Sequence, residues 1–240
     1  MEDSVGKGKE NKNVKKIKIF PVPFALKEFK ESISKTRSRN VLPKPSREQI
    51  INHALEYHSK GNIQEAAKYY QLFINQGFKD HRVFSNYGLI LKGIGKLKEA
   101  EIVTRKAIEL YPHDATAPSN LGIILNNLGN LKEAEESLRK AIELNPNFAD
   151  AHYNLGSLFI DLDKLKDAES STRKAIELNP DYSMAHLNLG VILKDLGNLQ
   201  EAELSTRKAI ELNPDYAIAH SNLGTVLRDL GNLKEAEESL

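Results

Sequence analysis

The sequence of 240 residues contains no cysteine, which excludes disulfide bonds and thiol chemistry. It also contains no run of about 18 apolar residues, the length that a membrane-spanning helix needs. Its first residues, MEDSVGKGKENKNVKK, hold none of the apolar core that a secretory signal requires. From these three absences we expect a cytoplasmic protein with no membrane span.

Charge is nearly balanced over the whole chain but uneven along it. The formal net charge is +1. Residues 1–46 contain 12 Lys and Arg against 5 Asp and Glu, a net charge of +7, whereas residues 47–240 contain 22 against 28, a net charge of −6. The basic segment carries scattered cations without interleaved aromatic residues. We therefore expect a solvated tail rather than a surface that binds nucleic acid or anionic lipid.

Small residues and prolines recur along the chain at one fixed interval of 34 residues. The glycines are Gly88, Gly122, Gly156, Gly190 and Gly224, the alanines are Ala66, Ala100, Ala134, Ala168, Ala202 and Ala236, and the prolines are Pro112, Pro146, Pro180 and Pro214. A fixed period of this length is typical of a solenoid, in which each repeat packs against the next. The repeat therefore predicts one elongated array in place of globular domains.

The repeat at residues 149–182 indicates its own local structure. Apolar residues with the spacing of one helix face predict a first helix over about 151–162 and a second over about 165–178. Asn179 and Pro180 end the second helix, because proline has no N–H and disfavours helical geometry in the residue before it.

Two positions between and within these helices call for small or permissive residues. Gly156 and Ala168 lack bulk, so we expect the two helices to approach closely there. In the other complete repeats the turn between the helices holds a glycine that can adopt the left-handed conformation: Gly61, Gly95, Gly129 and Gly197. Asp163 stands at this position in 149–182, and we predict that its turn is the softest of the array.

Taken together, these positions resemble the tetratricopeptide repeat family. The residues of 149–182 that match its pattern are Leu155, Gly156, Phe159, Ala168, Ala175 and Pro180. The resemblance covers residues 47–240 and implies an all-α fold, a right-handed superhelical solenoid of antiparallel helix pairs. One departure concerns the fourth position, where the family has a bulky aromatic residue. Unit two has Phe84 there, whereas the other units have Ile50, Pro118, His152, His186 and His220.

The period divides the chain into six units and a tail. The units are 47–80, 81–114, 115–148, 149–182, 183–216 and 217–240. Unit one is degenerate, as expected of a terminal repeat. Unit six stops within its second helix, and we expect either a longer parent polypeptide or a fragment.

The basic tail, residues 1–46, contains one apolar stretch. Residues 1–16 are too polar to bury a core, and we expect them to be disordered. We expect residues 15–27, KKIKIFPVPFALK, to form an extended arm, because Pro21 and Pro23 forbid a helix. Three interpretations of the arm stay open: a strand-like segment lying on unit one, a linear motif for a partner, or an occupant of the chain's own groove.

Asparagine occupies the sixth position of every unit: Asn52, Asn86, Asn120, Asn154, Asn188 and Asn222. Asparagine is a mediocre helix former, so helix formation does not account for it. Its carboxamide offers donors and an acceptor, the complement of a peptide backbone. We expect these six amides, here called the asparagine ladder, to line the concave face and to bind an extended polypeptide. The alternative is that they bond one another or water and only order the array.

The asparagine ladder resembles the series that lines the superhelix of O-linked N-acetylglucosamine transferases, whose repeats hold substrate chains. Two functions therefore stay open. One is a protein-interaction scaffold. The other is the substrate-holding arm of a larger transferase, such as a glycosyltransferase, whose catalytic domain lies beyond residue 240.

Catalysis and cofactor binding are not expected within these 240 residues. There is no nucleophile with a neighbouring base, and GKGK at residues 6–9 lacks the spacing of a phosphate loop. His152, His186 and His220 fall on successive units, at a spacing too wide for one metal ion, and we expect them to be partly buried and stacked. We predict no catalytic residue, no metal and no cofactor.

Overall fold

The structure, a computed structural model, describes residues 45–238. The predictions for residues 1–44, including the disordered tail and the apolar arm at 15–27, lie outside the described residues. Within that range the structure consists of twelve helices and contains no strand. The helices are α2 (Arg47–Ser59), α3 (Ile63–Asn75), α4 (His81–Gly93), α5 (Leu97–Leu110), α6 (Thr116–Asn127), α7 (Leu131–Leu144), α8 (Ala149–Asp161), α9 (Leu165–Leu178), α10 (Ser183–Asp195), α11 (Leu199–Leu212), α12 (Ala217–Asp229) and α13 (Leu233–Glu238).

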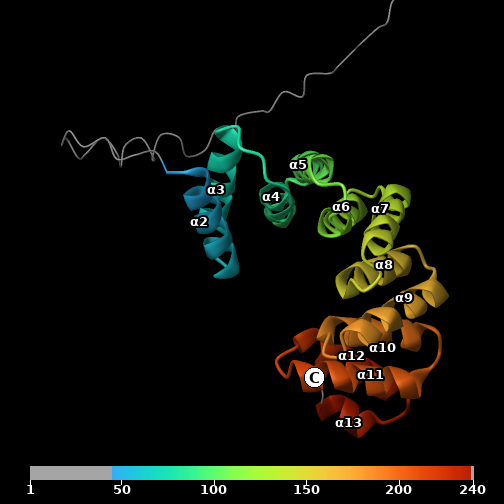
Figure 1. Ribbon diagram of the computed structural model, residues 1–240. Coiled ribbons are helices and arrows are strands. Elements are labelled where there is room, and N and C mark those ends of the chain that lie inside the picture. The colour runs from blue at the N-terminus through green and yellow to red at the C-terminus, as the bar shows by residue number, and fades with distance from the viewer. Residues whose placement is uncertain (1–44, 239–240) are drawn as a thin grey trace, which may run out of the picture. The chain divides into compact units, whose positions relative to one another are not determined.

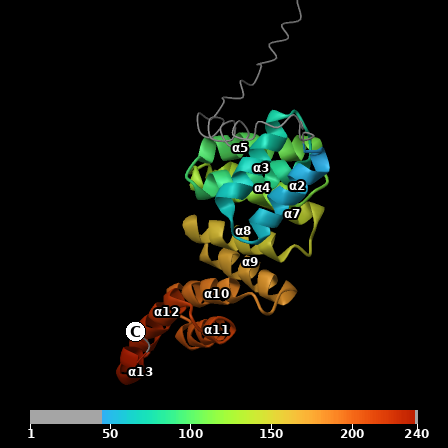
Figure 2. The same cartoon turned by 90° about the vertical axis from the view of Figure 1, so that its left-hand side faces the viewer.

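The helices form consecutive pairs, one pair per unit, which confirms the all-α fold of stacked helix pairs. We call the even-numbered member of each pair the A helix and the odd-numbered member the B helix. Each A helix packs on its B helix, and each B helix packs on the A helix of the next unit. Figure 1 and Figure 2 show the pairs succeeding one another in chain order.

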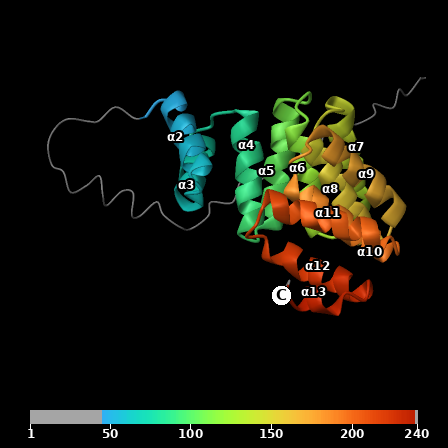
Figure 3. The ribbon, with the colours of Figure 1, turned by 90° about the horizontal axis from the view of Figure 1, so that it is seen from below.

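The A helices also touch one another directly. From α4 onward each A helix contacts the next one, so that α4, α6, α8, α10 and α12 form a continuous layer. Figure 3 shows α4, α5 and α6 lying side by side. Side chains at equivalent positions of the A helices therefore form a row along this layer.

The helices of unit four lie close to their predicted bounds. Helix α9 has the predicted ends, and α8 begins two residues earlier than predicted, because Phe148 is the last residue with extended backbone. The α8 residues buried in the core are Leu155, Leu158 and Phe159. They have the spacing of one helix face, which is why the periodicity located the helix.

The expected close approach within a pair is confirmed at Gly156. A Cβ atom at this position would lie 2.4 Å from the Thr172 hydroxyl oxygen on α9. Ala168 is fully buried on the same helix. A larger side chain at Gly156 therefore forces the two helices apart.

The turn of unit four has the predicted backbone. Asp163 has a φ of 56°, in the left-handed region, where the equivalent glycines have φ between 72° and 85°. It is the one residue other than glycine with positive φ in residues 45–238. Because a side chain is disfavoured in this region, Asp163 carries a local cost that the glycines avoid.

Candidate functional site

The six ladder asparagines lie in the second turn of the six A helices, one on each helix. Since each A helix from α4 onward contacts the next, consecutive amides lie on neighbouring helices. Among the described residues the amides do not bond one another. Instead, most of them reach back to the preceding unit.

Two of these contacts obey one rule. The Nδ2 atom of Asn120 donates to the Ser85 hydroxyl at 2.9 Å, and that of Asn154 donates to the Ser119 hydroxyl at 3.2 Å. Both serines occupy the fifth position of the preceding A helix. The asparagine at position six therefore ties its unit to position five of the unit before it.

Two other asparagines reach the preceding unit through a tyrosine, and one of them follows the same rule. Position five of unit four is Tyr153, and its hydroxyl lies within hydrogen-bonding reach of the Asn188 amide. Position five of unit one is Ile51, which offers no partner, and Asn86 instead reaches the hydroxyl of Tyr70 on helix α3. Four of the six amides therefore have a partner in the preceding unit.

The remaining two amides are free of such contacts within residues 45–238. Asn52 is exposed in the first unit, which has no unit before it. Asn222 is partly buried, and position five of the preceding unit is Leu187, which is apolar and buried. Asn222 lines a small hollow of about 70 Å³ together with Val191, Lys194 and Thr225. Its donors and acceptor are available to a ligand.

The six amides are therefore not equivalent, which the sequence did not indicate. Asn120 is only 7% exposed and lies between helices, whereas Asn154, Asn188 and Asn222 are partly exposed. The residue at position five of the preceding unit decides whether Asn120, Asn154, Asn188 and Asn222 have a partner there, but it does not decide how exposed they are.

The A helices of units five and six add exposed apolar side chains next to the asparagine ladder. At position two, Met184 is 42% exposed and Ile218 is 61% exposed. Close to them along the chain, in unit four, the rings of Tyr153 and Tyr182 lie 5.0 Å apart. Burial, with a hydrogen bond to Asp150, raises the pKa of Tyr182 well above its ordinary range, so that this phenol stays neutral.

The three histidines have a structural role that the sequence prediction missed. Each ring donates its Nε2–H to the carbonyl of a proline six residues earlier: His152 to Pro146 at 3.0 Å, His186 to Pro180 at 2.8 Å and His220 to Pro214 at 2.8 Å. They are partly buried as predicted, but among the described residues none of them contacts another ring. The recurring His and Pro at a separation of six residues could have indicated this bond.

Residues 45–238 contain no group of three or more His, Asp or Glu side chains arranged to hold a metal ion. No helix in this range is long and apolar enough to cross a bilayer.

On the B helices, charged side chains connect successive units. Arg105 bonds Glu101 on its own helix and Glu133 on the next B helix, the latter at 2.6 Å. The same double contact recurs at Arg173 with Glu169 and Glu201, and at Arg207 with Glu203 and Glu235. We call each contact between two B helices an arginine strap.

Two of the five junctions of the described array lack an arginine strap: Gln71 stands at the arginine position between units one and two, and the arginine between units three and four has no carboxylate partner on the next B helix. Arg139 bonds Glu135 on its own helix but makes no ion pair with Asp167, which stands where the other units have glutamate and is one methylene shorter. A weaker contact between Lys164 and Glu135, at 3.4 Å, connects the two units instead.

Comparison with known families agrees with the helix pairs and with the 34-residue period. Models described as tetratricopeptide repeat match residues 149–182 and 183–216, and further models of the same repeat match 48–75, 81–114, 124–163 and 206–238. These matches cover most of the chain, and the chain belongs to the tetratricopeptide repeat family.

Several solved structures are similar to this chain. YrrB, described as a tetratricopeptide repeat protein with an unusual peptide-binding site, is 28% identical, with a TM-score of 0.55 over 72% of this chain and 90% of YrrB. MamA is 26% identical, with a TM-score of 0.56 over 63% of this chain and 89% of MamA. PilF of Pseudomonas aeruginosa is 18% identical and shows the fold alone, with a TM-score of 0.70 over 80% of this chain and 88% of PilF. No curated protein sequence matches.

Proposed function

We propose that residues 45–238 form a protein-interaction scaffold that binds an extended polypeptide along the layer of A helices. The observation that carries this proposal is the row of carboxamides, one on each A helix. Each carboxamide can donate two hydrogen bonds and accept two, which matches the N–H and C=O groups of a bound main chain. The described peptide-binding site of the related protein YrrB supports the same class of function.

The spacing of the layer suits an extended chain. Packed helices lie roughly 8 to 10 Å apart, and an extended peptide rises about 3.3 Å per residue. One asparagine therefore meets the bound chain at about every third residue. Contacts to the main chain at this spacing recognise conformation more than sequence.

The bonds to the preceding unit orient the amides for this task. Asn154 uses one N–H on Ser119, which leaves its second N–H and its carbonyl oxygen for a ligand. A side chain that is already held in place loses less entropy when it binds. Asn222 differs, because no bond to the preceding unit competes with its ligand contacts. We expect Asn222, beside the exposed Ile218, to contribute most to affinity.

The transferase-arm function stays a prediction, because no contact in the described residues favours it over a scaffold. Both functions need the same groove. They differ only in whether a catalytic domain accompanies the repeats.

A degenerate peptide pool tests the proposal, because recognition of the main chain does not need one sequence. We expect fluorescein-labelled pools of 12-residue random peptides to bind the chain in an anisotropy titration. Pools with N-methylated backbones should not bind, because methylation removes the N–H donors. Equal binding of both pools, or of neither, contradicts the proposal.

Two variants of the chain test whether the bound peptide contacts Asn222. Asn222→Ala should weaken binding of the pool by roughly threefold to tenfold, which corresponds to the loss of one hydrogen bond of about 0.5 to 1.5 kcal/mol. Asn147→Ala, which alters an exposed asparagine in the α7–α8 loop, is the matched control and should bind as the wild type does. Equal affinity of the two variants contradicts the assignment of Asn222.

A further inference from the structure

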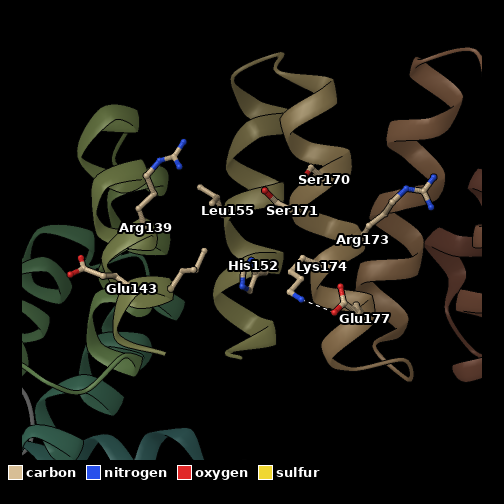
Figure 4. A pocket seen from close by; sticks show the side chains of 10 residues that line it. Arg139, Glu143, His152, Leu155, Ser170, Ser171, Arg173, Lys174 and Glu177 are labelled. Carbon is tan, nitrogen blue, oxygen red and sulfur yellow. Dashed lines mark hydrogen bonds and ion pairs between the residues drawn. The ribbon is translucent and has the colours of Figure 1, made fainter. Parts of the chain in front are cut away.

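A second cleft lies on the side of α8 that faces away from the asparagine ladder. It has a volume of about 730 Å³, within the range of ligand pockets, and is lined by the B helices α7 and α9 with α8 at its floor. Figure 4 shows Arg139 and Glu143 on α7 facing the α9 side chains across Leu155 and His152. On a helix of 3.6 residues per turn, His152 projects nearly opposite to Asn154. The cleft is therefore separate from the proposed groove.

Unit two shows which side chain fills the same position elsewhere in the array. There Phe84, at the position of His152, is 9% exposed and packs with Ile74 and Val103. The equivalents of those two neighbours in unit four are Ile142 and Ser171, and both line the cleft. At this place unit two has a phenyl ring, whereas unit four has the smaller imidazole of His152, which bonds the Pro146 carbonyl and leaves the cleft beside it.

The same junction lacks a carboxylate. Arg139 lines the cleft, and its side chain is 61% exposed. Among the described residues it bonds one carboxylate, that of Glu135, whereas Arg105, Arg173 and Arg207 each bond two. The second carboxylate is absent because Asp167 does not reach Arg139.

Charge is unevenly distributed within the cleft. Figure 4 shows the Arg139 guanidinium toward one end, whereas Glu143 and Glu177 lie toward the other. Lys174 bonds Glu177 at 2.6 Å, which partly neutralises that acidic end. A carboxylate is therefore favoured beside Arg139 and disfavoured beside Glu143.

We propose that this cleft is a docking site for a protein partner that presents an aromatic side chain next to an acidic residue. The ring packs over Ile142 and Leu155, beside His152, which holds the position that Phe84 fills in unit two. The neighbouring carboxylate pairs with Arg139 and takes the place of the missing arginine strap. Ser170 and Ser171 line the α9 wall and offer hydroxyl groups to the partner's polar atoms.

Peptides of defined composition test this site. The probe is a fluorescein-labelled nine-residue peptide of glycine and serine with Glu-Phe at its centre, and its controls carry Glu-Ala or Lys-Phe. We expect the Glu-Phe peptide to bind about tenfold more tightly than Glu-Ala, since an aromatic anchor carries most of the affinity of a small interface. Similar affinity of all three peptides overturns the proposal.

Variants of the chain identify the cleft and separate it from the groove. His152→Phe places a larger ring beside the cleft, as Phe84 does in unit two, and should abolish the preference for Glu-Phe. Because the substitution also removes the hydrogen bond to Pro146, thermal denaturation checks that the variant is folded. Arg139→Gln should abolish the preference of Glu-Phe over Lys-Phe. His186→Phe, in the next unit, is the matched control and should keep both preferences. A Glu-Phe preference that survives His152→Phe and Arg139→Gln contradicts the assignment.

The proposed peptide-binding groove and the proposed docking cleft can be tested separately. Asn222→Ala should weaken binding of the random peptide pool and leave the preference for the Glu-Phe peptide unchanged. If Asn222→Ala removes that preference, the peptide binds the groove and the cleft is not a site.

Discussion

The two faces of the helix stack connect neighbouring units by different chemistry. On the A helices the connection is a neutral hydrogen bond from an asparagine to position five of the preceding unit, as between Asn120 and Ser85. On the B helices it is an ion pair between exposed side chains, as between Arg173 and Glu201. A shielded hydrogen bond contributes more to stability than an exposed ion pair, which is screened by water and salt. We therefore expect the A face to hold the units together and the B face to adjust their spacing.

Between units one and two both faces lack this connection, because Ile51 and Gln71 stand at the connecting positions, and each face lacks it at one further junction between described units. On the A face Asn222 has no partner in the preceding unit because Leu187 occupies position five. On the B face Arg139 has no partner on the next B helix because Asp167 is too short. In both places one substitution in a neighbouring unit frees a polar group. Nearly identical repeats thus differ in their contacts between units without any change in the asparagine or the arginine itself.

The largest difference between variants is expected on the A face. Asn120→Ala leaves the buried Ser85 hydroxyl without its partner and should destabilise the array by roughly 1 to 3 kcal/mol. Asn222→Ala removes no bond between units and should stay within about 0.5 kcal/mol of the wild type. Urea denaturation monitored by circular dichroism measures both. Equal losses of stability in the two variants contradict the pairing rule.

A substitution in the turn between α8 and α9 should raise stability, whereas Asn120→Ala lowers it. Asp163→Gly relieves a side chain held at positive φ and should stabilise the α8–α9 turn by up to about 1 kcal/mol. Amide exchange in this turn is expected to be faster than at Gly129 or Gly197 in the wild type and to slow in the variant. Slower exchange at Asp163 than at those glycines would contradict this prediction.

On the B face, Asp167→Glu should restore the missing arginine strap. The gain in stability is expected to be about 0.2 to 1 kcal/mol at low ionic strength and to vanish in high salt, because the pair is exposed. Glu201→Asp is the matched control, since it removes the strap between α9 and α11 by the same one-methylene change. A gain that persists in high salt would show that a different interaction is responsible.

The smallest effect is expected in unit one, on the pH dependence of folding stability. Burial lowers the pKa of His58, whose Nδ1 lies 3.1 Å from the hydroxyl of Tyr70, the residue that Asn86 reaches. The unfolded chain therefore takes up this proton at a higher pH than the folded one does. Stability should fall as the pH drops below about 6.5, the ordinary value for histidine. His58→Gln should flatten this dependence in a stability titration, and an unchanged profile would assign it to other groups.

Much of the fold could be predicted from the sequence because the period fixed several positions at once. The 34-residue spacing of Gly156 and Ala168 with their equivalents predicted the helix pairs, and the glycine turns predicted the left-handed backbone of Asp163. These features depend on local geometry, and the same local geometry recurs in each repeat.

The contacts between units were harder to predict. The sequence showed an asparagine in every A helix, but the partner of Asn154 lies 35 residues earlier, at Ser119. Whether an asparagine amide has a hydrogen-bond partner depends on the residue at position five of the preceding unit. The 34-residue period identifies the positions that stay constant, and position five is not one of them. The cleft beside His152 was missed for the same reason, because it arises from two side chains that unit four lacks.

Crosslinking can test directly whether peptide binds to the A helices. The chain has no cysteine of its own, so a single introduced cysteine can be labelled specifically. A benzophenone maleimide attached to Thr225→Cys lies beside Asn222 on the A face, and one attached to Glu136→Cys lies on the exposed side of α7. Under illumination the random peptide pool should crosslink to the Thr225→Cys protein and far less to the Glu136→Cys protein. Equal crosslinking at both positions, or a higher yield on α7, would contradict binding along the asparagine ladder.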